Sequence, residues 1–188
     1  ADRVRFSLTA AFLMVNLRRN TPIGPGGGGM DSDSKVFGFE PAPAFAKNYL
    51  KCQREYSSLP HAELFNAAVG EHAGRLRFYF DADDPASSRL TAGGNIDADV
   101  VALDEALKGR RVTFIKMDIE GAELAALKGA RLIISGQKPK LAICVYHKFE
   151  DIWEIPEYIW SLAPEYSLYL RHHSPLSTET VLYAAPPD

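Results

Sequence analysis

The sequence predicts an α/β domain of three layers, with a mostly parallel sheet that ends in a C-terminal antiparallel hairpin. Two observations carry this prediction. The runs 112–118 and 141–146 are apolar without polar alternation, which is typical of strands buried on both faces of a parallel sheet. Helix-forming segments alternate with these runs, and two extended segments, 166–171 and 178–184, close the chain as a hairpin.

Composition and charge exclude some classes of protein. The 188 residues are 46% hydrophobic and carry a net charge of −3, and no run of Lys and Arg exceeds two residues. A nucleic-acid partner would need a basic patch, and a membrane span needs roughly 18 or more apolar residues in a row. We therefore expect neither partner. The two cysteines favour a reducing, cytoplasmic setting.

The N-terminal segment, residues 1–34, has a different character from the rest. Its apolar run 6–17 follows two arginines, as in a secretory signal, but it ends in two more arginines instead of a small-residue cleavage site. We expect a buried strand or helix there, or a homodimer contact. The tract 22–34 contains four consecutive glycines and is predicted to be a linker. The regular pattern of the α/β domain occupies 35–188.

The first half of that domain contains short elements. In chain order these are a strand at 36–39, a helix beginning at Pro43, a strand at 63–69 that Gly70 closes, an exposed or edge strand at 75–80, an extended segment at 99–103, and a brief helix that Asp104 caps and that ends at Gly109.

The second half is more regular. After the buried strand at 112–118, apolar spacing predicts a helix at 122–134, which Gly136 ends. The second buried strand, 141–146, is followed by a helix at 155–162.

Acidic residues gather where the first buried strand ends. Asp118, Glu120 and Glu123 surround Gly121, and His147 follows the second buried strand. In open α/β sheets, ligands bind beyond the carboxyl ends of the strands. An imidazole titrates near neutral pH and suits general-base work. The sequence predicts a catalytic site with His147 as base and Asp118 orienting it or binding substrate.

The remaining polar residues near this site allow two interpretations. The positive end of a helix dipole can stabilise the carboxylates of Glu120 and Glu123. Alternatively, the two groups can raise one another's pKa or bind a divalent cation. We favour the structural role for Glu123 and leave Glu120 open as a substrate-binding residue. No further ligand set is visible, so no metal is predicted. His172 and His173 point to opposite faces of a strand, and His172 is taken as the substrate-binding one.

Three motifs in this order resemble the FkbM-type methyltransferase family. They are Phe39-Glu-Pro41, the Asp-Ile-Glu-Gly-Ala-Glu segment of 116–123 with Leu127-Lys-Gly129, and the closing 170–183. The resemblance runs from about Val36 to Ala184. It implies a Rossmann-like fold, S-adenosylmethionine as cofactor, and methyl transfer to a hydroxyl of a sugar or small natural product.

Carried over residue by residue, the resemblance assigns Glu40 to the ribose hydroxyls of the cofactor, with Phe39 beside it. A carboxylate at a strand end can accept two hydrogen bonds from a diol. Asn66 and Ala67 would flank the adenine, and Asp118 would face both the methyl group and the acceptor. The alternative for Glu40 is that it caps the helix beginning near Pro43.

The chain departs from the family at its start. The family pattern has a strand, an Asp-x-Gly-Ala-x-x-Gly loop and a helix before the Phe-Glu-Pro strand, whereas this sequence has no Asp-x-Gly-Ala. Only a candidate strand at 11–17 and the glycine tract 24–29 precede that strand. The rival hypothesis is therefore a catalytically silent, methyltransferase-like module that binds or assembles.

Overall fold

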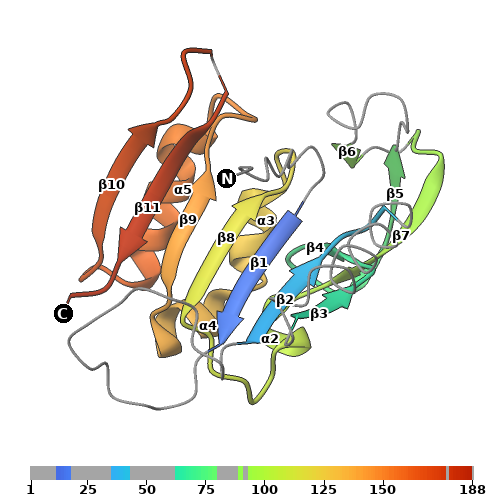
Figure 1. The fold of residues 1–188 in the computed structure, drawn as a ribbon, viewed down its shortest axis with the longest axis horizontal. Helices are drawn as coiled ribbons and strands as arrows, with labels where there is room; N and C mark the ends of the chain where they lie inside the picture. The colour runs from blue at the N-terminus through green and yellow to red at the C-terminus, as the bar shows by residue number, and fades with distance from the viewer. Residues whose placement is uncertain are drawn as a thin grey trace, which may run out of the picture.

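The chain forms a mixed α/β fold. The computed structural model describes residues 12–17, 35–42, 62–79, 89–90, 93–176 and 178–187. Within these ranges the strands form one sheet of seven strands and one of four (Figure 1). None of the described helices has the length and apolar character that crossing a membrane requires.

The seven-stranded sheet is mixed, not mostly parallel. In spatial order it contains β10 (Ser167–His172), β11 (Thr180–Ala185), β9 (Lys140–Cys144), β8 (Phe114–Asp118), β1 (Phe12–Leu17), β2 (Lys35–Phe39) and β3 (Ala62–Phe65). Only β8–β9 and β2–β3 pair in parallel. The predicted C-terminal hairpin is confirmed as the antiparallel pair β10–β11.

Two of the antiparallel pairings come from β1, which lies between β8 and β2. It runs antiparallel to both of its neighbours, and Leu13 pairs with Phe39 of β2 on one side and with Met117 of β8 on the other. The expectation of a strand or helix in this part of the N-terminal segment is thus met by a strand. Since β1 opposes both neighbours, β2 and β8 still point the same way.

A smaller sheet holds the middle of the chain. Its order is β4 (Ala68–Val69), β7 (Ile96–Val101), β5 (Gly74–Tyr79) and β6 (Arg89–Leu90). The strand predicted at 63–69 is therefore two strands, β3 and β4, which belong to different sheets. As expected, β5 is exposed, and its Arg75 makes a surface ion pair with Asp99 on β7 at 3.1 Å.

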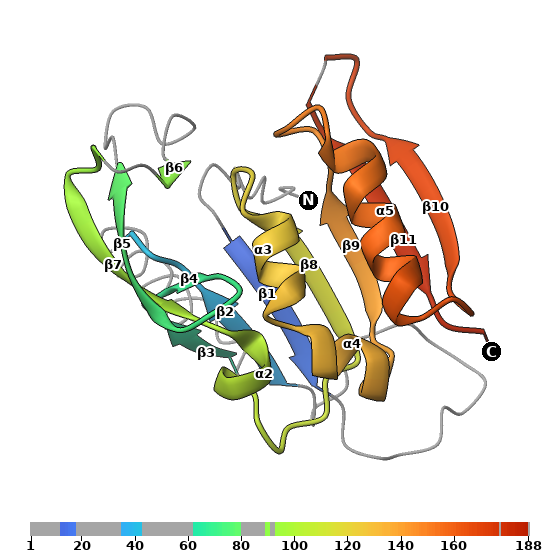
Figure 2. The same ribbon diagram turned by 180° about the vertical axis from the view of Figure 1, so that it is seen from behind.

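Helices α3 (Glu123–Lys128), α4 (Arg131–Gln137) and α5 (Asp151–Leu162) lie on one face of the large sheet (Figure 2). The prediction of one helix at 122–134 is wrong, because the first helix ends at Gly129 and a second begins at Arg131. A Cβ on Gly129 would lie 2.1 Å from the carbonyl oxygen of Gly70, so the backbones touch there. The linker at 22–34, the helix expected from Pro43 and the strand's end at Phe80 lie outside the described residues.

Asp104 caps a different helix from the one predicted. It lies inside α2 (Leu103–Ala106), whose N-cap is Ala102. Its two carboxylate oxygens accept hydrogen bonds from the N–H groups of Leu132 at 2.8 Å and Ile133 at 2.9 Å, in the first turn of α4. A long-range contact therefore satisfies donors that α4 cannot satisfy itself.

We expect Asp104→Ala to lower the free energy of unfolding by about 1 kcal/mol, because α4 loses the acceptor for two N–H groups. Urea denaturation measures the change. Glu105→Ala, at the exposed neighbouring position in α2, is the control and should stay within about 0.5 kcal/mol of the parent protein. Equal losses in the two variants would contradict the capping role.

Candidate functional site

The sequence-predicted site residues meet at one edge of the large sheet. Strands β2, β3, β8 and β9 run in the same direction, so their carboxyl ends share that edge. Asp118 pairs with Phe12 of β1, and Glu40 directly follows Phe39, the partner of Leu13. Glu40 and Asp118 therefore flank the start of β1, two strand spacings or about 10 Å apart along the edge.

Glu40 is almost fully enclosed. Its side chain is 3% exposed, and Oε1 accepts a hydrogen bond from the N–H of Ala42 at 2.8 Å. Burial raises the pKa of Glu40 to about 7, although the Ala42 N–H partly offsets this by stabilising the carboxylate. Hydrogen-bond donors from a bound ligand would stabilise the carboxylate form of such a buried group.

Of the other residues assigned to the cofactor, Asn66 contacts the backbone at Glu40, whereas Phe39 and Ala67 are buried. Asn66 donates from Nδ2 to the carbonyl oxygens of Glu40 at 2.8 Å and Pro41 at 3.1 Å, which fixes the backbone at the strand end. Phe39 is 1% exposed and stacks on Phe65 with ring centroids 4.8 Å apart. Ala67 is buried as well. Phe39 and Ala67 are thus part of the core behind the edge.

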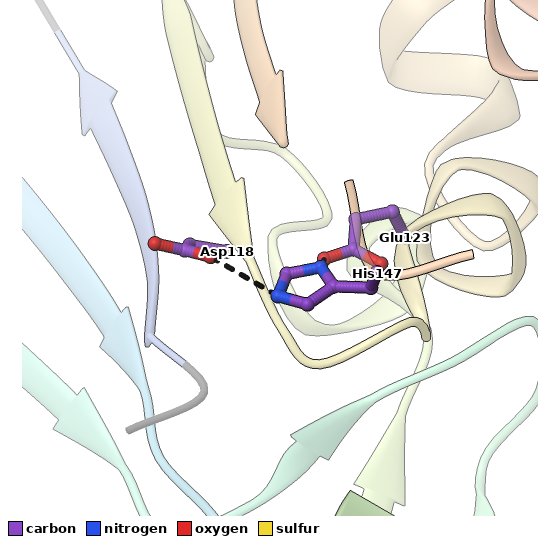
Figure 3. A group of neighbouring side chains, drawn as sticks. All are labelled: Asp118, Glu123 and His147. Carbon is purple, nitrogen blue, oxygen red and sulfur yellow. Dashed lines mark ion pairs between the residues drawn. The ribbon is translucent and has the colours of Figure 1, made fainter. Parts of the chain in front are cut away.

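The end of β8 presents Asp118 to three other polar side chains. Its Oδ1 accepts a hydrogen bond from the Tyr146 hydroxyl at 2.9 Å, and Lys116 Nζ lies 3.6 Å from Oδ2. His147 Nε2 is also 3.6 Å from Oδ1. The structure therefore brings the two residues predicted to be catalytic, Asp118 and His147, side by side (Figure 3).

His147 has a closer partner that the sequence prediction missed. Its Nδ1 lies 2.9 Å from Oε1 of Glu123, on the side away from Asp118 (Figure 3). Glu120 Oε2 lies 3.5 Å from Nε2. Glu123 is completely buried, and its Oε1 also accepts the N–H of Ile119 at 2.8 Å. The carboxylate nearest to the imidazole is thus that of Glu123, and the orienting role of Asp118 stays a prediction.

A turn with two residues in the left-handed region brings Glu123 next to His147. Glu120 and Gly121 have φ values of +54° and +87°, so the chain reverses directly after β8 and returns Glu123 to the strand end. The Lys148 ammonium donates to the carbonyl oxygen of Gly121, which joins this turn to the segment after β9. The spacing Asp-x-Glu-Gly-x-Glu, with glycine in the turn, was the sequence signal for this proximity.

The electrostatics of the cluster favour a bound positive charge. Burial disfavours the imidazolium of His147, but contact with Glu123 and the charges of Glu120 and Asp118 outweigh it and raise the pKa of His147 above its usual value. Burial, together with Asp118 and Glu123, also raises the pKa of Glu120, which His147 partly offsets. Three carboxyl groups thus compete for the positive charge of one imidazole.

Several buried atoms of the cluster lack a hydrogen-bond partner among the described residues. They are Glu123 Oε2 and both ring nitrogens of His147. The 2.9 Å contact of Nδ1 with Glu123 is a close ion pair, but it does not have the alignment of a hydrogen bond. Buried polar atoms in native proteins are generally paired, so these atoms point to a missing partner.

His172 does not join the cluster in this structure. It is exposed on the C-terminal hairpin, where its Nδ1 lies 2.9 Å from Thr180 Oγ1. The carbonyl oxygen of Thr180 accepts the N–H of Val145, so His172 does stand at the same edge of the sheet. Its substrate-binding role stays a prediction.

The fold and site together define an α/β domain whose polar groups converge at the carboxyl ends of its strands. Residues 29–173 match the model of the methyltransferase FkbM domain. This match covers most of the sequence, and the chain belongs to the FkbM methyltransferase family. The resemblance seen in the three sequence motifs is thereby confirmed.

A solved structure agrees. The chain is similar to the crystal structure of methyltransferase FkbM from Methylobacillus flagellatus KT, with 35% sequence identity and a TM-score of 0.63. The similarity covers 80% of this chain but only 36% of that one, so the chain spans about a third of the length of its solved relative. No curated protein matches the sequence.

We expect Gly121→Ala to lower the free energy of unfolding by about 1–3 kcal/mol. An added Cβ would be held at a positive φ and would lie 3.0 Å from Lys148 Cε and 3.6 Å from His147 Cβ. Gly136→Ala is the control, because its Cβ meets nothing within 4 Å and helical alanine stabilises by about 0.5–1 kcal/mol. Thermal and urea unfolding of both variants measure the difference. A Gly121→Ala variant as stable as the parent protein would show that the turn tolerates a side chain at this position.

Proposed function

We propose that this chain binds S-adenosylmethionine and transfers its methyl group to a hydroxyl of a sugar or small natural product. One observation carries the proposal. Glu40 and Asp118, assigned to the cofactor ribose and to the reaction centre, stand at the same sheet edge on either side of β1. Membership of the FkbM methyltransferase family supports methyl transfer as the reaction class.

The cofactor would bind through Glu40. Its carboxyl group is desolvated, with a pKa raised to about 7, and already has one backbone donor. A ribose diol supplies two further O–H donors, which would stabilise the carboxylate form that burial disfavours. Asn66 holds the backbone of Glu40 in place for this contact.

The acceptor would meet the cluster at the ends of β8 and β9. Methyl transfer from a sulfonium is an in-line displacement, in which alignment of the two reactants can contribute roughly 7–11 kcal/mol. Removal of the hydroxyl proton by a positioned base adds about 10²–10⁴-fold. His147 and Asp118, 3.6 Å apart, are the groups proposed to receive that proton.

A specific observation favours a second candidate, a catalytically silent binding module. The family pattern needs a glycine loop at the carboxyl edge directly after the central strand. Here β1 is antiparallel, so Leu17 at its end pairs with Lys35 at the start of β2, on the opposite edge from Glu40. The connection that contains the glycine tract therefore begins and ends away from the proposed site.

Calorimetric titration separates the two candidates. We expect S-adenosylmethionine and S-adenosylhomocysteine to bind in the micromolar range, and Glu40→Gln to weaken binding at least about tenfold through loss of a charged hydrogen-bond acceptor. Glu63→Gln, an exposed acid on neighbouring β3, is the matched control. Conversion of S-adenosylmethionine is then followed with hydroxylated acceptors. Absence of heat and of thermal stabilisation at millimolar ligand would favour the silent module.

The pKa of Glu40 predicts how this binding depends on pH. The diol needs the carboxylate form, so affinity for S-adenosylhomocysteine should be constant above about pH 7 and fall about tenfold for each pH unit below it. Glu40→Gln should abolish this dependence. Stability of the free protein should change in the opposite sense, because a carboxyl group with a raised folded-state pKa stabilises at low pH and loses that contribution as pH rises through 7. A parent profile that matches the variant's would exclude Glu40 as the ribose ligand.

A further inference from the structure

We propose that Asp118, Glu123 and His147 form a binding site for one divalent transition-metal ion. One oxygen or nitrogen from each residue lies within 4.8 Å of the others. The three side chains come from the end of β8, the first turn of α3 and the segment after β9, and the His147 ring lies between the carboxylates of Asp118 and Glu123 (Figure 3). No sequence motif for a metal predicted this set, because the turn at Gly121 creates it.

The strongest support is the buried polar atoms that have no partner. Glu123 is 0% exposed and the His147 side chain 9% exposed, yet Glu123 Oε2 and both His147 nitrogens lack a hydrogen bond among the described residues. Leaving a buried charged group unpaired costs more free energy than leaving a neutral group unpaired. A cation coordinated by these atoms satisfies a carboxylate oxygen and an imidazole nitrogen at once.

The charge balance points the same way. Asp118, Glu120 and Glu123 surround a single imidazole. Of the two described lysines nearby, Lys116 lies 3.6 Å from Asp118, and the Lys148 ammonium is directed at the carbonyl oxygen of Gly121. A doubly charged ion with a neutral His147 as its ligand would offset more of the carboxylate charge than one imidazolium does.

The ligand types indicate the class of metal. Two carboxylates and one imidazole suit Mn²⁺, Fe²⁺, Co²⁺ or Zn²⁺ better than Ca²⁺ or Mg²⁺, which prefer oxygen ligands alone. Three protein ligands leave coordination positions open. The role of these open positions rests on the proposed function, because the ion would hold and polarise the acceptor hydroxyl there. His147 would then be a metal ligand instead of the base.

The test uses the metal alone. Chelator-treated protein is titrated calorimetrically with Mn²⁺ and with Zn²⁺, and free Mn²⁺ is followed by its electron paramagnetic resonance signal. We expect one ion per chain and a rise in melting temperature. Asp118→Asn and His147→Gln should each weaken binding by at least about tenfold, since loss of even an outer-shell partner has that effect. Glu157→Gln, exposed on α5, is the control and should bind as the parent does.

The inference is overturned by absence of binding, or by binding that persists unchanged in both Asp118→Asn and His147→Gln. Circular dichroism of each variant shows whether it is folded, and Asp118→Asn is the main variant because Asp118 is partly exposed, unlike Glu123. Titration of the same metal-free samples with S-adenosylhomocysteine tests the proposed function separately. Cofactor binding without metal binding would reject only the metal site, and the reverse would reject only the cofactor site.

Discussion

The parallel pairing of β8 with β9 is the contact on which the rest of the structure depends. Ile115, Met117 and Ile143 on these strands are completely buried under α3, α4 and α5, and each such side chain contributes about 1.5–3 kcal/mol by its burial. Parallel strands end at the same edge, so this pairing also places Asp118 3.6 Å from His147. The stability of the core and the position of the polar cluster therefore have a common origin.

The antiparallel direction of β1 affects the two halves of the site differently. The contact between Asp118 and His147 does not depend on that direction, because Asp118 ends β8 and His147 follows β9, and these two strands pair in parallel. On the side of Glu40, β1 ends at the opposite edge of the sheet, so the chain does not leave this strand towards Glu40. Glu40 retains its place through β2 and β3, whose parallel pairing does not depend on the direction of β1. The proposed contact of Glu40 with a ribose therefore does not depend on a glycine loop after β1.

Local patterns predicted the elements and the edge of the site, whereas contacts between distant residues could not be predicted. Apolar runs encode buried strands directly, so the positions of Asp118 and His147 at strand ends followed from the sequence. The need for a glycine at position 129 could not, because it reflects the close approach of the Gly70 carbonyl oxygen. The role of Asp104 was missed for the same reason: its partners are the N–H groups of Leu132 and Ile133, far along the chain. Strand direction is likewise not encoded in an apolar run such as 12–17.

Glu123 shows why a helix dipole does not explain every acid at a helix start. Near the N-terminus of an exposed helix, a carboxylate gains about 0.3–1 kcal/mol. Glu123 is fully buried at the start of a six-residue helix, where desolvation of a charge costs several kcal/mol. The N–H of Ile119 satisfies only Oε1. The dipole is therefore too weak to offset the burial of an ionised Glu123, and a carboxylate here would need a positive charge beside it. Either a protonated His147 or a metal ion meets that requirement, and only the metal ion also uses the free oxygen of Glu123.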